Sequence, residues 1–495
     1  AGAGASSGMA MAHWEIQGWM ILILGWVFVP FYTRSMVYTM PEFLERRYNP
    51  QSRTILSVIS LVSYVLTKVA VTVYAGGLVF QQVFGIKELW GIDFFWIAAI
   101  GLVVLTALYT IFGGMKSVLY TSVLQTPILL LGSLIILVLG FKELGGWDEM
   151  MRVCGAVTVN DYGDTMTNLI RSNDDANFPW LGALIGSAII GFWYWCTDQF
   201  IVQRVLSGKN EMEARRGTIF GAYLKLTPVF LFLIPGMVAF AMQKHGITVN
   251  GETFTMSSAD AAFPTLVAKL LPAGFKGLVV CGILAALMSS LASLFNSSAM
   301  LFTIDFYKKY RPKASEKTLL YVGRVATVVV VVLGILWIPV MKSVGSVLYN
   351  YLQDVQSVLA PGIAAAFLLG ICSKKATPKG GMWGLIAGFI IGITRLGAKV
   401  YYTSGATFSD SWFKYLFYDT NWLFFCGGML LFCMLVIVVV SRFTTPAPAE
   451  QIVGLTFGST TDEQKAVTRA SWNKWDVIHS AIIILITVVF YWYFW

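Results

Sequence analysis

The sequence predicts an all-α polytopic membrane protein, and its high hydrophobicity and long apolar runs are the observations that predict this class. Of the 495 residues, 57% are hydrophobic and 12% are charged, and the mean hydropathy of +0.70 lies outside the range of soluble globular domains. Many apolar runs reach the roughly 20 residues that a helix needs to cross about 30 Å of hydrocarbon. Uninterrupted runs of this length exclude a β-barrel, whose strands would alternate over about ten residues.

About twelve segments meet this length requirement. In chain order they are 15–34, 54–85, 93–113, 117–142, 179–204, 217–242, 277–306, 318–340, 346–373, 380–401, 421–441 and 473–495. The first residues, AGAGASSGMAMA, contain neither an initiating Met nor a charged signal-peptide region, and they are too short and glycine-rich for a full span. We therefore expect a truncated start, and a missing tail after IIILITVVFYWYFW, which stops inside an apolar helix.

The basic residues predict the orientation of the spans, because lysine and arginine concentrate in cytoplasmic connections. Every second connection is basic, and the residues are Arg34, Arg46, Arg47, Arg53, Arg204, Lys209, Arg215, Arg216, Lys308, Lys309, Arg311, Lys313, Lys317, Lys374, Lys375 and Lys379. The acidic loop at 143–178 is then external. The net charge of +9 thus reflects topology in the lipid bilayer of a cell membrane and indicates no nucleic-acid partner. All cysteines except Cys154 fall inside spans, so packing is expected of them rather than a disulfide framework.

No linker or block of charge divides the chain, so we expect one membrane domain. Residues 1–142 hold a partial opening helix and four predicted spans, and residues 179–373 hold five. An odd number of spans gives the two halves opposite orientations, which an inverted repeat requires. We expect 143–178 to be an external loop and 374–495 to form peripheral helices.

Lysines lie deep inside two predicted spans, Lys68 in LVSYVLTKVAVTVYAG and Lys225 in GAYLKLTPVFLFLIPG. A charge in hydrocarbon costs a few kcal/mol or more, so it normally faces a wet cavity or a partner and indicates a functional site. With Glu15 and Gln353 these lysines supply donors and acceptors that suit a neutral polyhydroxyl compound, whereas Glu15 would repel an anion. A structural ion pair is the alternative for the lysines, and a carboxylate at a helix N-terminus is the alternative for Glu15.

An aromatic run, GFWYWC at 191–196, lies inside another span. The ring of Trp195 can stack on the C–H face of a pyranose, and the phenol of Tyr194 can close the site or bind a hydroxyl. Packing or an interfacial belt is the alternative. Asp198, Gln199 and Arg204 follow towards the cytoplasmic end of this span, where a gate or a helix-end ion pair is expected rather than ligand contact.

The span at 277–306 carries small polar residues in ALMSSLASLFNSSAM. Ser289, Ser293 and Asn296 share one helix face, which Ser290 and Ser297 extend. Hydroxyl and backbone oxygens suit a hard, singly charged cation such as sodium. A seam of small residues that lets helices approach closely is the alternative.

No enzyme pattern emerges. The histidines are His13, His245 and His479, and they are scattered. The sequence has no cysteine–histidine metal spacing, phosphate loop or nucleophile elbow. Chemistry on a substrate is therefore not expected.

Five ordered stretches resemble the sodium/solute symporters, and the sodium/glucose cotransporter branch most of all. They are TMPEFLERRY at 39–48, GGMKSVLYTSVLQT at 113–126, FWYWCTDQFIVQR at 192–204, YLKLTPVFLFLIPG at 223–236 and ALMSSLASLFNSSAMLFTIDFY at 286–307. The resemblance runs to about Lys375 and implies a leucine-transporter fold, a five-plus-five inverted repeat with alternating access.

By the same resemblance, residues of this chain match sugar-binding and sodium-binding positions. The implied sugar-binding residues are Glu15, Lys68, Lys225 and Gln353, with Trp195 and Tyr194 as stacking and inner-gate aromatics; the implied sodium ligands are Ala286, Ser289 and Ser290. Three departures from the family pattern follow. The backbone carbonyls of the broken first helix, which also bind sodium in the family, would lie upstream of Ala1. Ser122 replaces a frequent aspartate, which puts a second sodium ion in doubt. Gly191 replaces a polar residue that faces the sugar, which puts the choice among hexoses in doubt.

The expected function is sodium-coupled symport of a neutral hexose, glucose or galactose, with sodium co-transported rather than bound as a resident cofactor. Two other hypotheses stay open. In the first, the protein is a sodium-coupled carrier of myo-inositol or a sugar acid. In the second, it is a sugar-gated sensor or channel without concentrative uptake.

Overall fold

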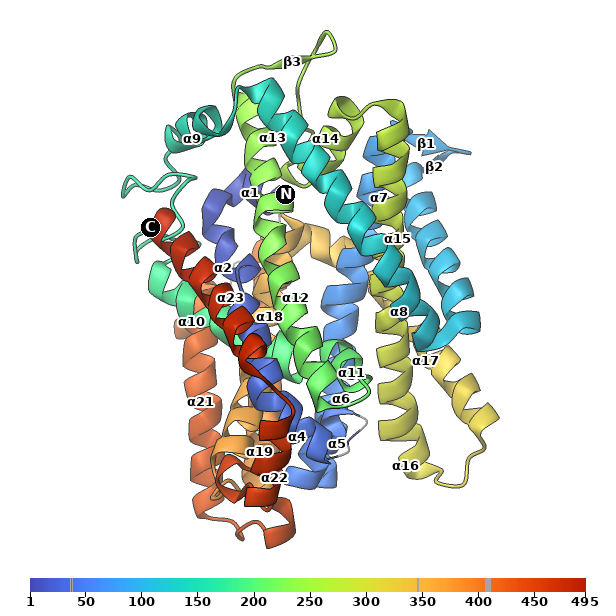
Figure 1. The fold of residues 1–495 in the computed structure, drawn as a ribbon, viewed down its shortest axis with the longest axis vertical. Helices are drawn as coiled ribbons and strands as arrows, with labels where there is room; N and C mark the ends of the chain where they lie inside the picture. Colours follow the sequence, from blue (N-terminus) through green and yellow to red (C-terminus); the bar gives the residue numbers. More distant parts are fainter. Residues whose placement is uncertain (36, 38, 345–346, 406–410) are drawn as a thin grey trace.

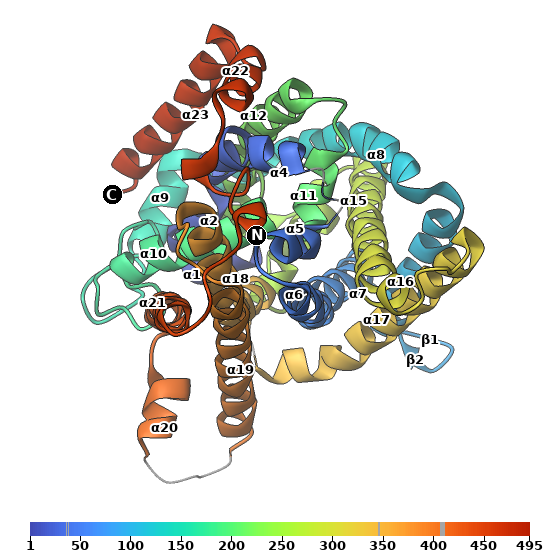
Figure 2. The same ribbon diagram turned by 90° about the horizontal axis from the view of Figure 1, so that it is seen from below.

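Long helices running along the longest axis of the molecule make up the fold (Figures 1 and 2). The computed structural model describes residues 1–35, 37, 39–344, 347–405 and 411–495, without the side chains of 109, 111–119, 121, 122, 124 and 342–344. The opening helices and the helix at Leu348–Cys372 are the most enclosed of the candidate spans, with 72% and 83% of their apolar windows buried. The core of the molecule therefore lies around these two elements.

The helices and strands have the following bounds. The first part contains α1 (Gly2–Ser7), α2 (Ala12–Glu15), α3 (Gly18–Ile23), α4 (Val29–Ser35), α5 (Met40–Arg47), α6 (Pro50–Ser63), α7 (Ala70–Phe84), β1 (Glu88–Leu89), β2 (Ile92–Asp93), α8 (Phe94–Leu144) and α9 (Trp147–Gly155). The middle contains α10 (Trp180–Gly191), α11 (Gln199–Leu206), α12 (Glu211–Pro228), α13 (Ile234–Lys244), β3 (Thr248–Val249), β4 (Glu252–Thr253), α14 (Ala262–Leu270), α15 (Ala273–Met300), α16 (Lys308–Tyr310), α17 (Glu316–Val344) and α18 (Leu348–Cys372). The last part contains α19 (Pro378–Thr403), α20 (Trp412–Lys414), α21 (Trp422–Arg442), α22 (Asp462–Ala470) and α23 (Lys474–Tyr493).

Within the described residues, eleven helical segments are long and apolar enough to cross a membrane. They are Gly2–Ser35, Pro50–Phe84, Gln125–Leu144, Trp180–Thr197, Glu211–Lys244, Ala273–Tyr310, Glu316–Met341, Leu348–Cys372, Pro378–Thr403, Trp422–Arg442 and Lys474–Tyr493. Most of the predicted spans therefore agree with the structure to within a few residues. The two differences concern the chain start and α8.

The first candidate span begins at Gly2, so the prediction that it begins near Glu15 was wrong. Glycine explains the difference, because it lets these residues pack as helix against neighbouring backbone: a Cβ on Gly4 would collide with the carbonyl oxygen of Leu233. Gly8 has φ +64°, and a Cβ there would collide with the carbonyl oxygen of Met166. The glycine-rich start is thus a tightly packed part of the bundle.

The predicted spans 93–113 and 117–142 belong to one helix, α8. A straight helix of its 51 residues would be about 75 Å long, more than twice the hydrocarbon thickness. Figure 1 shows that α8 turns back, with β2 before it and α9 after it at the same end of the molecule. The part at Gln125–Leu144 meets the length requirement, whereas Phe94–Leu108 is shorter.

Several helices contain a π-helical segment, in which the backbone hydrogen bond skips one more residue than in an α-helix. These segments are η2 (Leu24–Phe28), η3 (Tyr64–Val69), η4 (Phe192–Thr197), η5 (Val229–Leu233), η7 (Leu301–Tyr307) and η8 (Tyr415–Asp419). Such turns are rare and are found frequently at functional sites. Lys68 lies in η3, and Tyr194 and Trp195 lie in η4.

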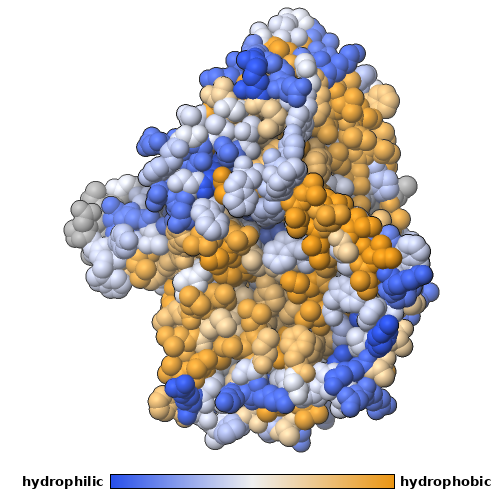
Figure 3. Space-filling model, turned by 60° about the vertical axis from the view of Figure 1, so that its left-hand side comes forward, coloured by the Kyte–Doolittle hydropathy of each residue, from blue (hydrophilic) through white to orange (hydrophobic). Residues whose placement is uncertain are grey.

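The surface separates into an apolar belt and two hydrophilic ends, as expected of a protein in a bilayer (Figure 3). The end with α5, α16 and α22 carries the connections predicted to be cytoplasmic, and the opposite end holds α9, β1 and β3 (Figure 1). The loop at 143–178, predicted to be external, includes α9 and lies at this opposite end.

A fully buried arginine joins helices at the basic end. Arg47 donates hydrogen bonds to the carbonyl oxygens of Gly370 at 2.6 Å, Ser373 at 2.7 Å and Ala376 at 3.2 Å. These carbonyls belong to the end of α18 and to the connection after it, which have no further helical turn to satisfy them. Arg47 therefore fixes α5 to the α18–α19 connection.

All six cysteines are free, in agreement with the prediction that they form no disulfide framework. Cys154 lies outside the spans, and burial raises the pKa of its thiol to about 12. A thiol held neutral in this way is a weak nucleophile.

Candidate functional site

One cavity of about 450 Å³ opens near the middle of the bundle. Its wall contains the residues that the sequence singled out as sugar-binding: Glu15, Lys68, Tyr194, Trp195, Lys225 and Gln353. They come from α2, η3, η4, α12 and α18, which lie far apart in the sequence. Its volume lies within the roughly 300–1,000 Å³ typical of small-molecule sites.

The helix that carries Glu15 is interrupted directly after it. Ile16 and Gln17 leave helical geometry with ψ of 27° and 28°, and α3 begins at Gly18. The Gln17 side chain donates to the carbonyl oxygen of Ser187 at 2.8 Å. Irregular backbone at membrane depth is tolerated where it is buried in protein or lines a cavity, and Gln17 satisfies both conditions.

Gly191 makes room for this interruption. A Cβ at Gly191 would lie 2.6 Å from Oε1 of Gln17. The glycine noted as a departure from the family pattern therefore accommodates the Gln17 side chain, and both residues line the cavity.

Glu15 and Lys225 form an ion pair in the cavity wall, with Nζ 2.6 Å from Oε2. Their side chains are 15% and 14% exposed, and the hydroxyl of Tyr349 donates to Oε1 of Glu15. Lys225 Nζ also lies 5.6 Å from the centre of the Trp195 ring. Pairing compensates the cost of burying both charges, while partial exposure leaves them accessible from the cavity.

Lys68 forms a second and more deeply buried ion pair, with Asp198. Asp198 also accepts a hydrogen bond from the hydroxyl of Tyr64 at 2.8 Å and caps α11 by accepting from the backbone nitrogen of Phe200 at 3.0 Å. Rings of Tyr64, Tyr194 and Phe200 surround the ammonium group at 4.4–4.8 Å. The helix-end ion pair proposed for Asp198 from the sequence is thus present, and Lys68 is its partner.

The amide oxygen Oε1 of Gln353 and the indole nitrogen Nε1 of Trp14 are among the buried polar atoms of the cavity residues that have no hydrogen-bond partner within the described part of the chain. Buried polar atoms are normally satisfied, and leaving one without a partner costs about 1–3 kcal/mol. A solute or water molecule in the cavity could therefore donate a hydrogen bond to this oxygen and accept one from this nitrogen.

Trp195 and Tyr194 are half-buried, and their rings meet edge to face with centres 5.0 Å apart. Both line the cavity. Arg204, further along the same segment, also lines it and donates to Ser293 on α15.

The predicted sodium ligands lie on α15 but do not share one environment. Ser290 lines the cavity, whereas Ser289 is buried and Ala286 is half-buried outside the cavity wall. The hydroxyl of Ser293 donates to the carbonyl oxygen of Ser289 at 2.9 Å. The side chain of Ser122, the other position that the sequence raised for sodium, is not among those described.

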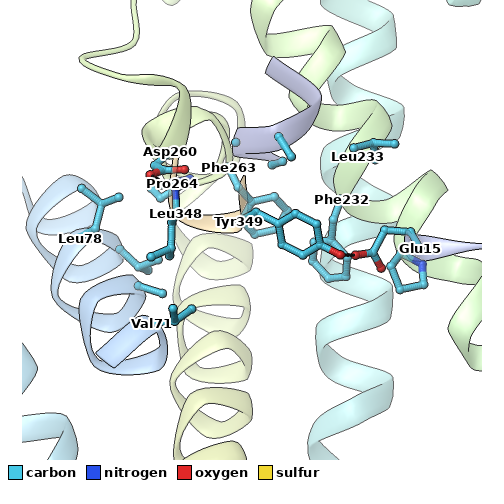
Figure 4. A pocket seen from close by; sticks show the side chains of 16 residues that line it. Glu15, Val71, Leu78, Phe232, Leu233, Asp260, Phe263, Pro264, Leu348 and Tyr349 are labelled. Carbon is cyan, nitrogen blue, oxygen red and sulfur yellow. Dashed lines mark hydrogen bonds between the residues drawn. The ribbon is translucent and has the colours of Figure 1, made fainter. Parts of the chain in front are cut away.

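A second cavity of about 350 Å³ shares Glu15, Val71 and Tyr349 with the first. Figure 4 shows the Tyr349 ring reaching across to the Glu15 carboxylate, with Phe232 and Phe263 beside it. The wall is mostly apolar. The Glu15–Tyr349 hydrogen bond therefore lies where the two cavities meet.

Comparison with known proteins places this arrangement in a family. The model of the Sodium:solute symporter family matches residues 1–388. The chain belongs to this family. It is a sodium-coupled solute symporter, a multi-pass membrane protein and not an enzyme.

The relatives with similar sequences are cotransporters. The chain is 38% identical to sodium/glucose cotransporter 1 of Ovis aries over 90% of this chain and 70% of that protein. It is 38% identical to sodium/glucose cotransporter 4 of Homo sapiens over 92% of this chain and 69% of that protein. It is 36% identical to sodium/glucose cotransporter 2 of Rattus norvegicus over 92% and 71%.

A solved structure shows the same fold. The substrate-bound outward-open state of a Na⁺-coupled sialic acid symporter superposes with a TM-score of 0.68 at 20% identity, covering 90% of this chain and 86% of that chain. At this identity the likeness concerns the fold.

Sequence reasoning about this symporter missed Tyr349 and the indole nitrogen of Trp14. Tyr349 lies four residues before Gln353, so the two share a face of α18, and this spacing was a signal that could have found it. Trp14 was noted only as the neighbour of Glu15. Its lack of a partner is visible only in three dimensions.

We predict that Asp198→Asn destabilises the symporter by roughly 3–5 kcal/mol, because it leaves the Lys68 ammonium group buried without a counter-charge. The double variant Lys68→Met with Asp198→Asn should recover most of this loss, since it removes both charges. Thermal unfolding in detergent measures both effects.

The matched control for this pair is Asp462→Asn, which breaks the exposed pair with Lys465 and should leave the midpoint of thermal unfolding unchanged, because exposed ion pairs contribute little to stability. A double variant that is as unstable as the sum of its single variants would contradict the assignment of Lys68 and Asp198 as a pair.

Proposed function

We propose that this symporter carries a neutral hexose, glucose or galactose, together with sodium. The observation that carries the proposal is the central cavity, which combines two neutralised lysine–carboxylate pairs with an acceptor, Oε1 of Gln353, and a donor, Nε1 of Trp14, that have no partner among the described residues. Each hydroxyl of a sugar both donates and accepts a hydrogen bond, so a sugar can satisfy the two kinds of atom together.

The charge balance of the lysines favours a neutral solute over an acid. Glu15 neutralises Lys225 and Asp198 neutralises Lys68. An anion would have to displace a carboxylate from its lysine or share the lysine with it. A hydroxyl group can instead add to Lys225 or Glu15 without breaking the pair.

The aromatic residues would orient the ring of the solute. Trp195 is proposed to stack on the C–H face of the pyranose, with Tyr194 closing the inner side. Gln353 is proposed to donate to one hydroxyl and accept from another, which its partnerless oxygen supports.

The proposed mechanism is alternating access in a five-plus-five inverted repeat, with residues 1–142 and 179–373 as the two repeats. Sodium would bind at Ala286, Ser289 and Ser290 from the outside and favour the state in which the sugar site is formed. Coupling requires each ligand to stabilise the binding state of the other by about 1–3 kcal/mol. The driving force includes about 2.3 kcal/mol per 100 mV for each sodium charge moved.

A sugar acid is the second candidate substrate, and specific observations favour it. Arg204 lines the cavity as a third cation beside the two paired lysines, and the similar solved structure is that of a sialic acid symporter. Myo-inositol, a neutral polyol, satisfies the same hydrogen-bonding atoms as a hexose. These candidates are separated by competition.

We expect concentrative uptake of labelled glucose or galactose into proteoliposomes under an inward sodium gradient, and its loss when the gradient is dissipated. Unlabelled glucose and galactose should compete more strongly than myo-inositol, and sialic acid should not compete. Strong inhibition by the acid but not by the hexoses would overturn the choice of substrate. Sugar-induced current without accumulation would indicate a sensor or channel.

Gln353→Ala should raise the sugar concentration for half-maximal uptake by about tenfold, since one buried hydrogen bond contributes roughly 1–1.5 kcal/mol. The sodium dependence should stay unchanged. Gln81→Ala, at the end of α7 and away from the cavity, is the control and should behave like the unmodified protein. An unchanged sugar dependence for Gln353→Ala would remove this residue from the site.

Ser290→Ala should raise the sodium concentration for half-maximal activation by about fivefold or more, because the loss of one oxygen ligand costs ~1 kcal/mol. Ser298→Ala, on the same helix α15, is the matched control because it removes a buried hydroxyl outside the cavity. Unchanged sodium activation in a folded Ser290→Ala protein would contradict the sodium assignment.

A further inference from the structure

A cavity of about 500 Å³ lies at the basic end of the molecule, where α18 and α21 end and α19 begins. Its wall carries the cations Lys374, Lys375 and Arg442 together with the hydroxyl groups of Ser373 and Ser441. This end is the one predicted to be cytoplasmic. The cavity is separate from the transport site described above.

The frame around this basic cavity is held by hydrogen bonds that leave the cations untouched. The backbone nitrogen of Thr377 donates to the hydroxyl of Ser441 at 3.0 Å, and the hydroxyls of Thr377 and Thr444 lie 2.6 Å apart. Arg47 donates hydrogen bonds to the carbonyl oxygens of Ser373 and Ala376. The three helix ends are therefore fixed relative to one another without the use of Lys374, Lys375 or Arg442.

These cations differ from other basic residues of the same end. Arg46, Arg53 and Arg215 pair with Glu42, Asp305 and Glu211. By contrast, Lys374, Lys375 and Arg442 form no ion pair with any residue that the structure describes, although each is exposed. Three cationic residues thus border one cavity without an ion-pair partner among the residues that the structure describes.

The floor of the basic cavity is apolar and continues onto the outer surface of α21. Leu369, Ile437 and Val438 line the floor, and Val438 is 42% exposed. Directly beyond Arg442, the ring of Phe443 is 85% exposed, as expected of an aromatic residue at the membrane interface. A free phosphate would use the cations only, whereas an acyl chain would also cover this apolar floor.

We propose that the basic cavity binds the headgroup of an anionic phospholipid of the cytoplasmic leaflet, with the phosphate between Lys374, Lys375 and Arg442 and an acyl chain along Leu369 and Val438. Basic pockets between transmembrane helices on the cytoplasmic side are suited to such headgroups. The proposal is independent of the transported solute, because it involves none of the residues of the central cavity.

Lipid binding to the full chain, purified in detergent and titrated with phosphatidylglycerol under native mass spectrometry, tests the proposal. The triple variant Lys374→Gln, Lys375→Gln, Arg442→Gln should bind roughly fivefold more weakly for each cation removed. The matched control is Arg311→Gln, Lys313→Gln, Lys317→Gln, which removes the same charge from the α16–α17 connection and the first turn of α17 and should bind like the unmodified protein. Equal weakening of both triple variants would overturn the proposal, because it would indicate diffuse surface charge.

Competition distinguishes the lipid from a free anion. Phosphatidylcholine with the same acyl chains, glycerophosphoglycerol and inorganic phosphate should each displace phosphatidylglycerol poorly. Displacement by inorganic phosphate or glycerophosphoglycerol at the same concentration as the intact lipid would overturn the assignment to a phospholipid. Equal binding of phosphatidylcholine and phosphatidylglycerol would overturn the charge-based site altogether.

A second pair of variants keeps the test decisive if the triple variant fails to fold. The Ser373 hydroxyl accepts from the backbone nitrogen of Lys375 at 3.2 Å, and both Asp and Asn can replace this acceptor. Ser373→Asp adds a negative charge to the cavity and should weaken phosphatidylglycerol binding about fivefold. Ser373→Asn has nearly the same shape and should not, and equal binding by the two variants would contradict the proposal.

Discussion

The need to neutralise charge inside hydrocarbon shapes the whole centre of this symporter. An isolated ammonium group or carboxylate at this depth is costly, and removing one member of a buried pair costs more than removing both. The Lys68–Asp198 and Lys225–Glu15 pairs meet this need across helices that are distant in sequence. They therefore fix where η3, α11, α12 and α2 lie relative to one another, and they do so at the wall of the cavity.

Pairing also decides what the cavity offers to a solute. Once each lysine has its carboxylate, the two lysines no longer require an anionic group on the solute. The buried atoms Oε1 of Gln353 and Nε1 of Trp14, which have no partner among the described residues, then require hydrogen bonds from it. The same principle explains the contrast with the basic cavity at the end of α18. There the cations have no ion-pair partner in the described part of the chain and lie at the basic end of the molecule, where a lipid headgroup can approach them.

The sequence was most informative where the physical cost of an alternative is highest. Spans follow from the length of apolar runs, so α18 at Leu348–Cys372 nearly coincides with the predicted 346–373. Lys68 was conspicuous because hydrocarbon penalises charge. Its partner could not be predicted, because Asp198 is 130 residues away and only the packing of helices brings the two together. The environment of the Trp14 indole likewise depends on tertiary structure. The π-helical segments could not be predicted either, because a helix that is apolar on every side has no hydrophobic periodicity that an extra residue would shift.

The π-helical segments make the number of residues as important to this site as their identity. In an α-helix each residue advances the direction of the side chain by about 100°, so deleting one residue from η3 or η4 would turn all that follows by roughly that angle. Every side chain would still be present, yet Asp198 and the aromatic residues would point to different neighbours. The arrangement of side chains around the cavity therefore depends partly on the number of residues in each π-helical segment. Substitutions do not change this number, so only insertions or deletions of single residues would test its role.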